Sequence, residues 1–308
     1  MAQSLEVLAH HTETLHSIRG IVRTMKTMSA INALPYEQAA TAIEAYRNTV
    51  LDGFHAFLHR NGPLPRDRAP AGAPVVIAFG SDHGLCGNYN ELIAAEVDRT
   101  VEASRLICVG AQLEDALAGQ GLGVAATLFP PATADGLGRL AGRLITRLDA
   151  MRHEAAPGDI AVSLVFMQRA AHGQQAPVSR RLLPLDPELM AELAVRPWTS
   201  RSLPHLTLTP DALLAALIRS YLFAEIFRAA AEALVTENAS RLARMQQAEQ
   251  SVDERLEELT AETRSVRQSE ITTELLDVVI GFEALKDRDK RRQGEPPADP
   301  SAGEDGTG

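Results

Sequence analysis

The sequence predicts an α/β fold combined with long helices: a Rossmann-like α/β domain is inserted between the N- and C-terminal helices, which pair as an antiparallel coiled coil. Both ends of the chain are rich in Ala, Leu, Arg and Glu, with apolar residues at spacings of three and four. In the middle, short β-branched apolar runs alternate with helical stretches. A Pro- and Gly-rich segment, residues 61–74, is predicted to link the first helix to that middle domain.

The N-terminal helix is expected over residues 1–60. Pro35 should kink or interrupt it, because proline removes one backbone donor and clashes with the preceding turn. The helix is expected to resume at Tyr36 and to run to about His59. Its apolar stripe, which needs a partner, consists of Leu15, Ile18, Val22, Met25 and Ser29.

The inserted domain is expected over residues 75–208, with a largely parallel sheet. Residues 178–185 are a candidate edge strand, and residues 186–208 are too mixed and Pro-rich to assign. The other predicted elements are strands at Val75–Phe79, Arg105–Val109 and Ile160–Met167, and helices at Asn90–Val101 and Asp135–His153.

The C-terminal helix is expected over residues 209–285. Thr209-Pro210-Asp211 is a helix start, and no helix breaker follows until Gly281. Such a helix would be roughly 115 Å long and must protrude from a small domain. Residues 286–308, basic and then rich in Pro, Gly and acid, are expected to form a disordered tail. The predicted seam residues are Val252, Leu256, Leu259, Thr263, Val266, Ile271, Leu275 and Val278.

Composition excludes several classes of protein. The 308 residues are 45% hydrophobic, which predicts an ordered protein, and the net charge of −10 argues against nucleic-acid binding. No apolar run approaches the roughly 18 to 20 residues needed to cross a bilayer, and the N-terminus lacks a signal pattern. We therefore expect a cytoplasmic location, with any membrane association made through other proteins. Cys86 and Cys108 are expected to be free thiols.

The turn Ser81 to Gly87 admits two interpretations. Asp82, His83 and Cys86 could form a nucleophilic cysteine with a histidine base. In the structural alternative, Ser81 or Asp82 caps the following helix and Cys86 packs inward with Leu85.

In the same structural alternative, Gly84 and Gly87 would permit the tight turn. The same glycines could cradle a phosphate, but the chain has no Gly-x-x-x-x-Gly-Lys-Ser/Thr motif, so no nucleotide or other cofactor is expected.

Several segments, in order along the chain, resemble the gamma subunit family of F-type rotary ATP synthases. IVRTMKTMSA (residues 21–30) resembles the family's Ile-Thr-Lys-Ala-Met-Lys-Met-Val-Ser-Ala, and SDHGLCGNYN (residues 81–90) resembles Ser-Asp-Arg-Gly-Leu-Cys-Gly-Gly-Tyr-Asn. ENASRLARM (residues 237–245) and RQSEITTELLDVVIGFEAL (residues 267–285) resemble the family's C-terminal helix. The departures, Pro35, His83, Asn88, Phe282 and the long tail, indicate a divergent bacterial member.

The resemblance implies a non-catalytic central shaft that couples transmembrane ion (proton) flow to ATP synthesis or hydrolysis in the catalytic beta subunits, and that regulates ATPase activity. The implied partners are the alpha and beta subunits, the epsilon subunit and the membrane c-ring. The implied location is peripheral, on the cytoplasmic side of the bacterial inner membrane. The rival functions are a stand-alone coiled-coil scaffold and the cysteine-dependent enzyme.

The resemblance also assigns a surface for binding the beta subunit. Met25 and Lys26 on the first helix, with Arg267 and Gln268 on the last, would face a loop of beta. An arginine fork gives directional bonds to carboxylates or carbonyls, so it could grip one beta subunit and release it as the shaft turns. Thr273 and Glu274 would share this surface. The alternative for Arg267 and Gln268 is an ordinary solvated helix face.

Overall fold

The computed structural model describes residues 2–64, 74–100, 105–154, 160–170 and 174–293. The chain divides into two compact units, which are described separately: residues 22–248, and residues 1–21 together with 249–308. Within the described ranges, no helix is both long enough and apolar enough to cross a membrane.

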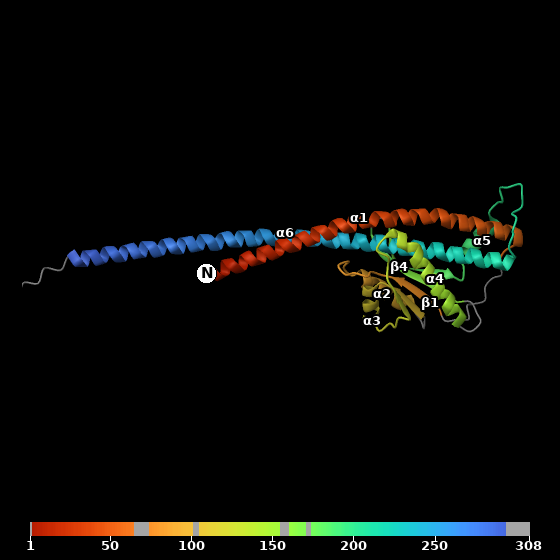
Figure 1. The fold of residues 1–308 in the computed structure, drawn as a ribbon, viewed down its shortest axis with the longest axis horizontal. Helices are drawn as coiled ribbons and strands as arrows, with labels where there is room; N and C mark the ends of the chain where they lie inside the picture. The colour runs from red at the N-terminus through yellow and green to blue at the C-terminus, as the bar shows by residue number, and fades with distance from the viewer. Residues whose placement is uncertain (1, 65–73, 101–104, 155–159, 171–173, 294–308) are drawn as a thin grey trace, which may run out of the picture. The chain divides into compact units, whose positions relative to one another are not determined.

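Two long helices, α1 (Ala2–Asn61) and α6 (Pro210–Gln293), contribute to both units (Figure 1). The expected interruption of α1 at Pro35 is wrong, because α1 continues through it. Proline deprives the carbonyl of Ile31, four residues earlier, of its helical donor. Because Pro35 and Ile31 are both exposed, water can satisfy that carbonyl.

Helix α6 also continues through Gly281 and eight residues past the expected end at 285. Residues 286–293, expected to belong to a disordered tail, are therefore helical, while residues 294–308 lie outside the described residues. A single glycine costs only about 1 kcal/mol in a helix, and the basic side chains that follow it suit the negative end of the helix dipole.

Between these helices the chain forms a five-stranded sheet in the order β3-β2-β1-β4-β5. The sheet is parallel except for β5, which pairs antiparallel with β4. The edge position expected of residues 178–185 is confirmed, and the strand begins at Gln175. The strands are β1 (Val75–Phe79), β2 (Arg105–Val109), β3 (Ala126–Leu128), β4 (Val162–Arg169) and β5 (Gln175–Leu183).

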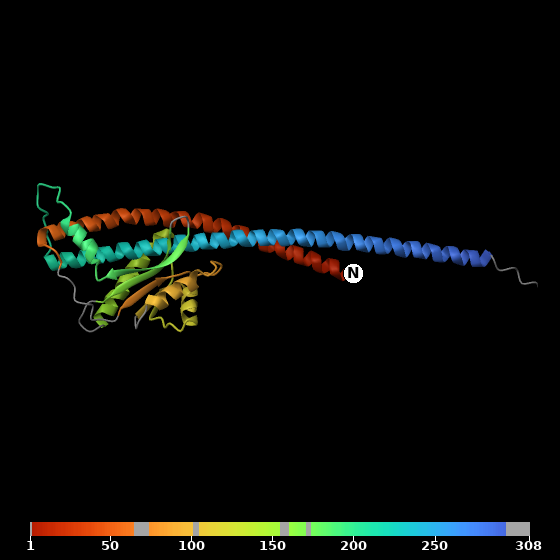
Figure 2. The same ribbon diagram turned by 180° about the vertical axis from the view of Figure 1, so that it is seen from behind.

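The central strand β1 is buried on both faces. Val75, Ile77 and Phe79 join a core with α4 and α6, whereas Val76 and Ala78 join a second core with α2 and α3. Helix α6 is therefore one of the layers that cover the sheet (Figure 2). The remaining helices are α2 (Tyr89–Thr100), α3 (Ala111–Gly119), the 3-10 turn η1 (Ala134–Gly136), α4 (Leu137–Glu154) and α5 (Pro187–Val195).

Within residues 22–248, α1 and α6 pack antiparallel. The rings of Phe54 and Tyr221 lie 6.1 Å apart, and Arg47, earlier in α1, binds Glu225, later in α6. The same order holds within the other unit, where the Arg19 guanidinium lies 3.2 Å from the Asp253 carboxylate. The expected antiparallel direction of the two helices is confirmed within residues 22–248.

The predicted seam of α6 is only partly buried. Leu256 and Leu259 are buried, and Val252, Thr263 and Val266 are half-buried. Because Arg19 pairs with Asp253 and both helices rise about 1.5 Å per residue, the start of α1 reaches only to about residue 270 of α6.

The seam assignment of the later residues Ile271, Leu275 and Val278 is therefore wrong, and all three are exposed. On α1, Ile18 is exposed as well, although Val22 and Ser29 of the same predicted stripe are buried.

Candidate functional site

The proposed beta-binding pair, Arg267 and Gln268, is exposed on α6. No hydrogen bond or ion pair of either side chain is found within the described part of the chain. The backbone carbonyl of Gln268 accepts a hydrogen bond from the Thr272 hydroxyl at 2.8 Å, and the Gln268 side chain is exposed. The apolar residue that directly precedes this pair, Val266, is half-buried.

Thr273 and Glu274 differ in what they can offer a partner. The Thr273 hydroxyl donates to the carbonyl of Ser269 at 2.9 Å, so only its oxygen lone pairs remain for a further bond. Glu274 is exposed and presents a full carboxylate. Thr273 is half-buried and is the weaker candidate of the two.

Met25 and Lys26 are half-buried on α1, and they belong to the unit of residues 22–248, whereas Arg267 belongs to the other unit. Their sharing one surface with Arg267 therefore stays a prediction. Four large apolar residues near them on α1 are exposed as well: Ile21, Met28, Ile31 and Leu34.

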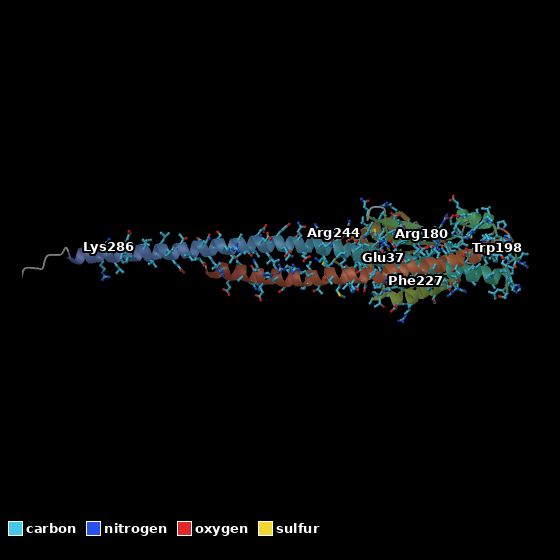
Figure 3. The ribbon with its side chains drawn as sticks, turned by 90° about the horizontal axis from the view of Figure 1, so that it is seen from above. Glu37, Arg180, Trp198, Phe227, Arg244 and Lys286 are labelled. Carbon is cyan, nitrogen blue, oxygen red and sulfur yellow. The ribbon has the colours of Figure 1, made fainter. Side chains whose placement is uncertain are left out.

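The last part of α6 carries a feature that the sequence analysis missed. Its large apolar side chains are exposed and cover more of the helix surface than a single seam, although the analysis assigned three of them to one seam. The signal was present in the run Val278-Val279-Ile280, because three consecutive apolar residues cannot all face one seam. We call these residues the apolar end of α6, which is followed by Lys286 in Figure 3; they are Ile271, Leu275, Leu276, Val278, Val279, Ile280, Phe282 and Leu285.

The turn after β1 is held by buried hydrogen bonds. The Asn90 side chain accepts from the Ser81 backbone N–H at 2.9 Å and donates to the Ser81 hydroxyl at 2.8 Å. Asp82 accepts from the backbone N–H of Ala111 at 3.4 Å. The expectation that Ser81 or Asp82 caps the following helix is wrong, because Asp82 meets the start of α3 instead.

Two residues of this turn adopt left-handed backbone conformations, Gly87 (φ 71°) and Leu85 (φ 66°). Glycine is favoured at position 87 by its positive φ, and a Cβ atom there would also displace the Arg244 guanidinium, whose Nε would lie 2.3 Å away. Leu85 is exposed rather than packed inward, and it takes the strained conformation that was expected of Gly84.

An ion pair on α6 fixes the outer side of the turn. The Arg241 guanidinium donates to the buried Glu237 carboxylate at 2.7 Å and to the carbonyls of His83 and Gly84 at 3.0 and 3.3 Å. Burial raises the pKa of Glu237, and the Arg241 charge offsets part of that rise. The resemblance of residues 81–90 and of 237–245 to one family thus has a physical basis, because these segments bind each other.

Cys86 has the environment of a structural thiol. Burial raises its pKa, and its sulfur lies 3.4 Å from the Ser81 hydroxyl and 3.9 Å from the His83 carbonyl. The His83 ring is exposed and makes no hydrogen bond to this sulfur in the described structure. Cys108 is also a free, buried thiol, and burial raises its pKa to about 12. The geometry opposes the cysteine-nucleophile interpretation, since the reactive species is the thiolate.

Comparison with known proteins agrees with the resemblance. The chain is 26% identical over 301 residues to the ATP synthase gamma chain of Dinoroseobacter shibae, covering 92% of this chain and 99% of that one. It is 27% identical over 220 residues to the ATP synthase gamma chain of Nitratidesulfovibrio vulgaris, covering 68% and 73% of the two chains.

Solved structures share the fold. A chain of the OSCP/F1/c-ring part of Euglena gracilis mitochondrial ATP synthase matches with a TM-score of 0.66 and 13% identity, over 97% of this chain and 99% of that one. A chain from the central stalk and c-ring of Tetrahymena thermophila mitochondrial ATP synthase matches with a TM-score of 0.51 and 18% identity, over 74% and 99%. A family model described as ATP synthase matches residues 4–285, and the chain therefore belongs to the ATP synthase family.

Proposed function

We propose that this chain is the central rotor shaft of an F-type ATP synthase, coupling ion flow through a membrane sector to ATP synthesis or hydrolysis in partner subunits. The observation that carries the proposal is the family match over residues 4–285, together with relatives named ATP synthase gamma chain over most of their length. The chain itself is non-catalytic in this proposal, and ATP is made or split in the beta subunits.

The apolar end of α6 supports the proposal. A monomeric protein rarely exposes a contiguous apolar patch of this kind unless another molecule covers it. An apolar sleeve formed by the alpha and beta subunits would cover these side chains and let the helix turn, because apolar contacts are non-directional. The function of a stand-alone coiled-coil scaffold would not explain why the apolar end of α6 extends past the reach of α1.

Asymmetry would provide the coupling. α1 and α6 pair as an unequal antiparallel coiled coil, which cannot match a threefold ring, so each beta subunit meets a different face of the shaft. Directional bonds from Arg267 and Gln268 to one beta subunit would shift the population of open and closed catalytic sites at each step. Met25 and Lys26 would contact beta from α1. Glu274 adds a carboxylate to this surface, and Thr273 an acceptor oxygen.

The remaining partners follow from the same proposal. The α/β domain and the lower part of the helix pair rest on the epsilon subunit and the c-ring, which places the protein peripherally on the cytoplasmic side of the bacterial inner membrane. No cofactor is required of this chain, since the nucleotide chemistry lies in beta.

Purification of a tagged copy from cells tests the assignment. We expect alpha and beta subunits to copurify in a complex with ATPase activity. A matched variant, in which Leu276, Val279 and Ile280 are replaced by Ser, should remain folded, because these residues are exposed in the isolated chain. Smaller amounts of the alpha and beta subunits should copurify with this variant. Recovery of the tagged chain without alpha and beta would refute the rotor assignment.

A further inference from the structure

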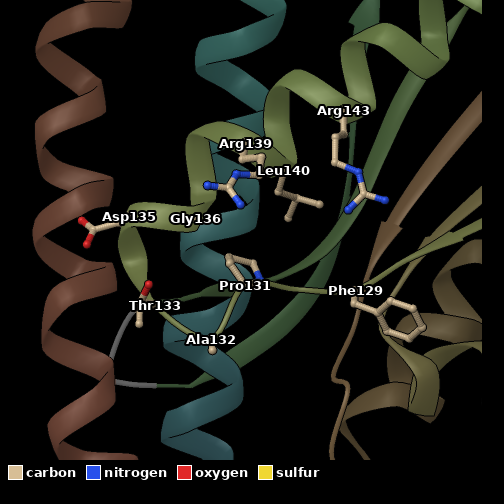
Figure 4. Close-up of a pocket in the computed structure, with 9 residues that line it drawn as sticks. All are labelled: Phe129, Pro131, Ala132, Thr133, Asp135, Gly136, Arg139, Leu140 and Arg143. Atoms are coloured by element: carbon tan, nitrogen blue, oxygen red, sulfur yellow. The ribbon is translucent and has the colours of Figure 1, made fainter.

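A cavity of about 370 Å³ opens where the Phe129–Thr133 segment meets the start of α4. Arg139 and Arg143 of α4 line it together with Phe129, which is exposed, and Figure 4 shows both guanidinium groups beside this segment. Asp135 also lines the cavity, but its carboxylate points away from the two guanidinium groups in Figure 4.

The walls of this cavity are fixed before any ligand arrives. The Tyr36 hydroxyl of α1 donates to the Pro131 carbonyl at 3.0 Å, which ties the segment to the body of the protein. A Cβ atom on Gly136 would lie 2.4 Å from the Pro131 Cβ, so glycine permits this close approach. The floor is therefore rigid, and binding there would cost little ordering of the backbone.

The cavity lies at one end of a basic row. Arg139, Arg143 and Arg147 follow one another at four-residue intervals on α4, and all three side chains are exposed. No ion pair or hydrogen bond of these three side chains is found among the residues that the structure describes. This is notable in a chain with a net charge of −10, where acidic partners are abundant.

We propose that this basic row and its cavity form a docking site for an acidic segment of a partner protein, with an apolar side chain of that segment seated against Phe129 and Pro131. Charge complementarity carries the choice of partner. Guanidinium groups four residues apart on a helix are separated by about 6 Å along its axis, which matches carboxylates spaced four apart on a partner helix.

A small anion fits the observations less well. The row extends about 12 Å along α4, and Arg147 lies outside the cavity, whereas a phosphate group needs donors that converge on one point. The exposed Phe129 ring is likewise explained by an apolar contact of a protein segment.

Fluorescence anisotropy with the full chain tests the proposal. The probe is a labelled helical peptide with three Glu residues at four-residue spacing and one Leu, and its control carries Gln in place of each Glu. We expect binding of the Glu peptide only, and roughly tenfold or greater weakening by the double substitution Arg139→Gln and Arg143→Gln. The matched control Arg152→Gln, which removes an exposed arginine of α4 outside the cavity, should leave the affinity unchanged.

Equal binding of the Glu and Gln peptides, or wild-type affinity in the double variant, would overturn the proposal. Calorimetry with inorganic pyrophosphate is the second arm, and tighter binding of pyrophosphate than of the peptide, lost in the double variant, would identify a small-anion site instead. Both assays use the chain alone, so their failure would leave the rotor assignment intact.

Discussion

Two segments of the same helix, α6, have opposite environments. Residues 221–238 are almost entirely buried against the sheet and α1. In residues 271–285, which contain the apolar end, every residue except the half-buried Thr273 is exposed. Both segments are rich in apolar residues, so composition does not distinguish them. The difference teaches that burial depends on which other elements the chain supplies: the first segment has a sheet and a helix as partners, and the second lies beyond the reach of α1.

The buried segment even accommodates charge. Glu225, which is 1% exposed, accepts hydrogen bonds from Arg47, Arg180 and Arg228, which lie on α1, β5 and α6. One carboxylate thus joins three elements. The apolar end has no such internal network in the described structure, and we expect its energetic contribution to appear only in the assembled complex.

Glu225→Ala should cause the largest loss of stability. Removing the carboxylate leaves three guanidinium groups around a buried site, and breaking a buried ion pair typically costs about 3–5 kcal/mol. Urea unfolding of the isolated chain measures this. Its control is Glu258→Ala, whose exposed carboxylate pairs with the exposed Arg255, and which should change stability by less than about 1 kcal/mol. Equal effects of the two variants would contradict the proposed role of Glu225.

A matched pair of isoleucines tests the comparison directly. Ile226 is fully buried and Ile280 is 62% exposed on the same helix. Ile226→Ala should destabilise the isolated chain by about 2–5 kcal/mol, while Ile280→Ala should stay within about 0.5 kcal/mol of the parent. Unfolding curves of the two variants would show this difference in stability. A large loss of stability from Ile280→Ala would mean that the chain itself covers its apolar end.

Cys86→Ala should have a smaller effect. The thiol is buried but only weakly hydrogen bonded, so we expect a loss of about 1–2 kcal/mol and near-normal coupling in the complex. Thermal unfolding of the chain checks the loss of stability, and ATPase assays of the complex check the coupling. A folded and assembled Cys86→Ala complex without activity would restore the thiol-chemistry interpretation.

The sequence predicts much of this fold because its signals are local. The runs at Val75–Phe79 and Arg105–Val109 have apolar β-branched composition and form β1 and β2 with the predicted bounds. Strand β3 was missed because three residues carry too little pattern, and α5 was missed in a Pro-rich region, although Asp186 caps it through the backbone N–H of Glu188.

The candidate site was predictable to a different extent. Arg267 and Gln268 are exposed, in agreement with the helical phase of the half-buried Val266, while their contact with a beta subunit stays a prediction. The role of Asp82 could not be predicted, since its partner is the N–H of Ala111, 29 residues away and brought close by the sheet. The exposure of Ile271 and Leu275 depends on where α1 begins relative to Asp253, a register that helical periodicity does not contain.

The central claim, that exposed side chains in the last part of α6 act on partner subunits, is tested most directly by Arg267→Ala combined with Gln268→Ala. ATP hydrolysis and ATP-driven ion pumping are measured side by side in membrane vesicles that carry the double variant. Neither side chain supports the chain's own core, so the complex should assemble. A charged hydrogen bond is worth about 1.5–3 kcal/mol, so its loss in one rotational state should alter rates by roughly ten- to hundredfold and weaken coupling. Unchanged hydrolysis, pumping and complex stability would contradict the account and leave the pair as an ordinary solvated helix face.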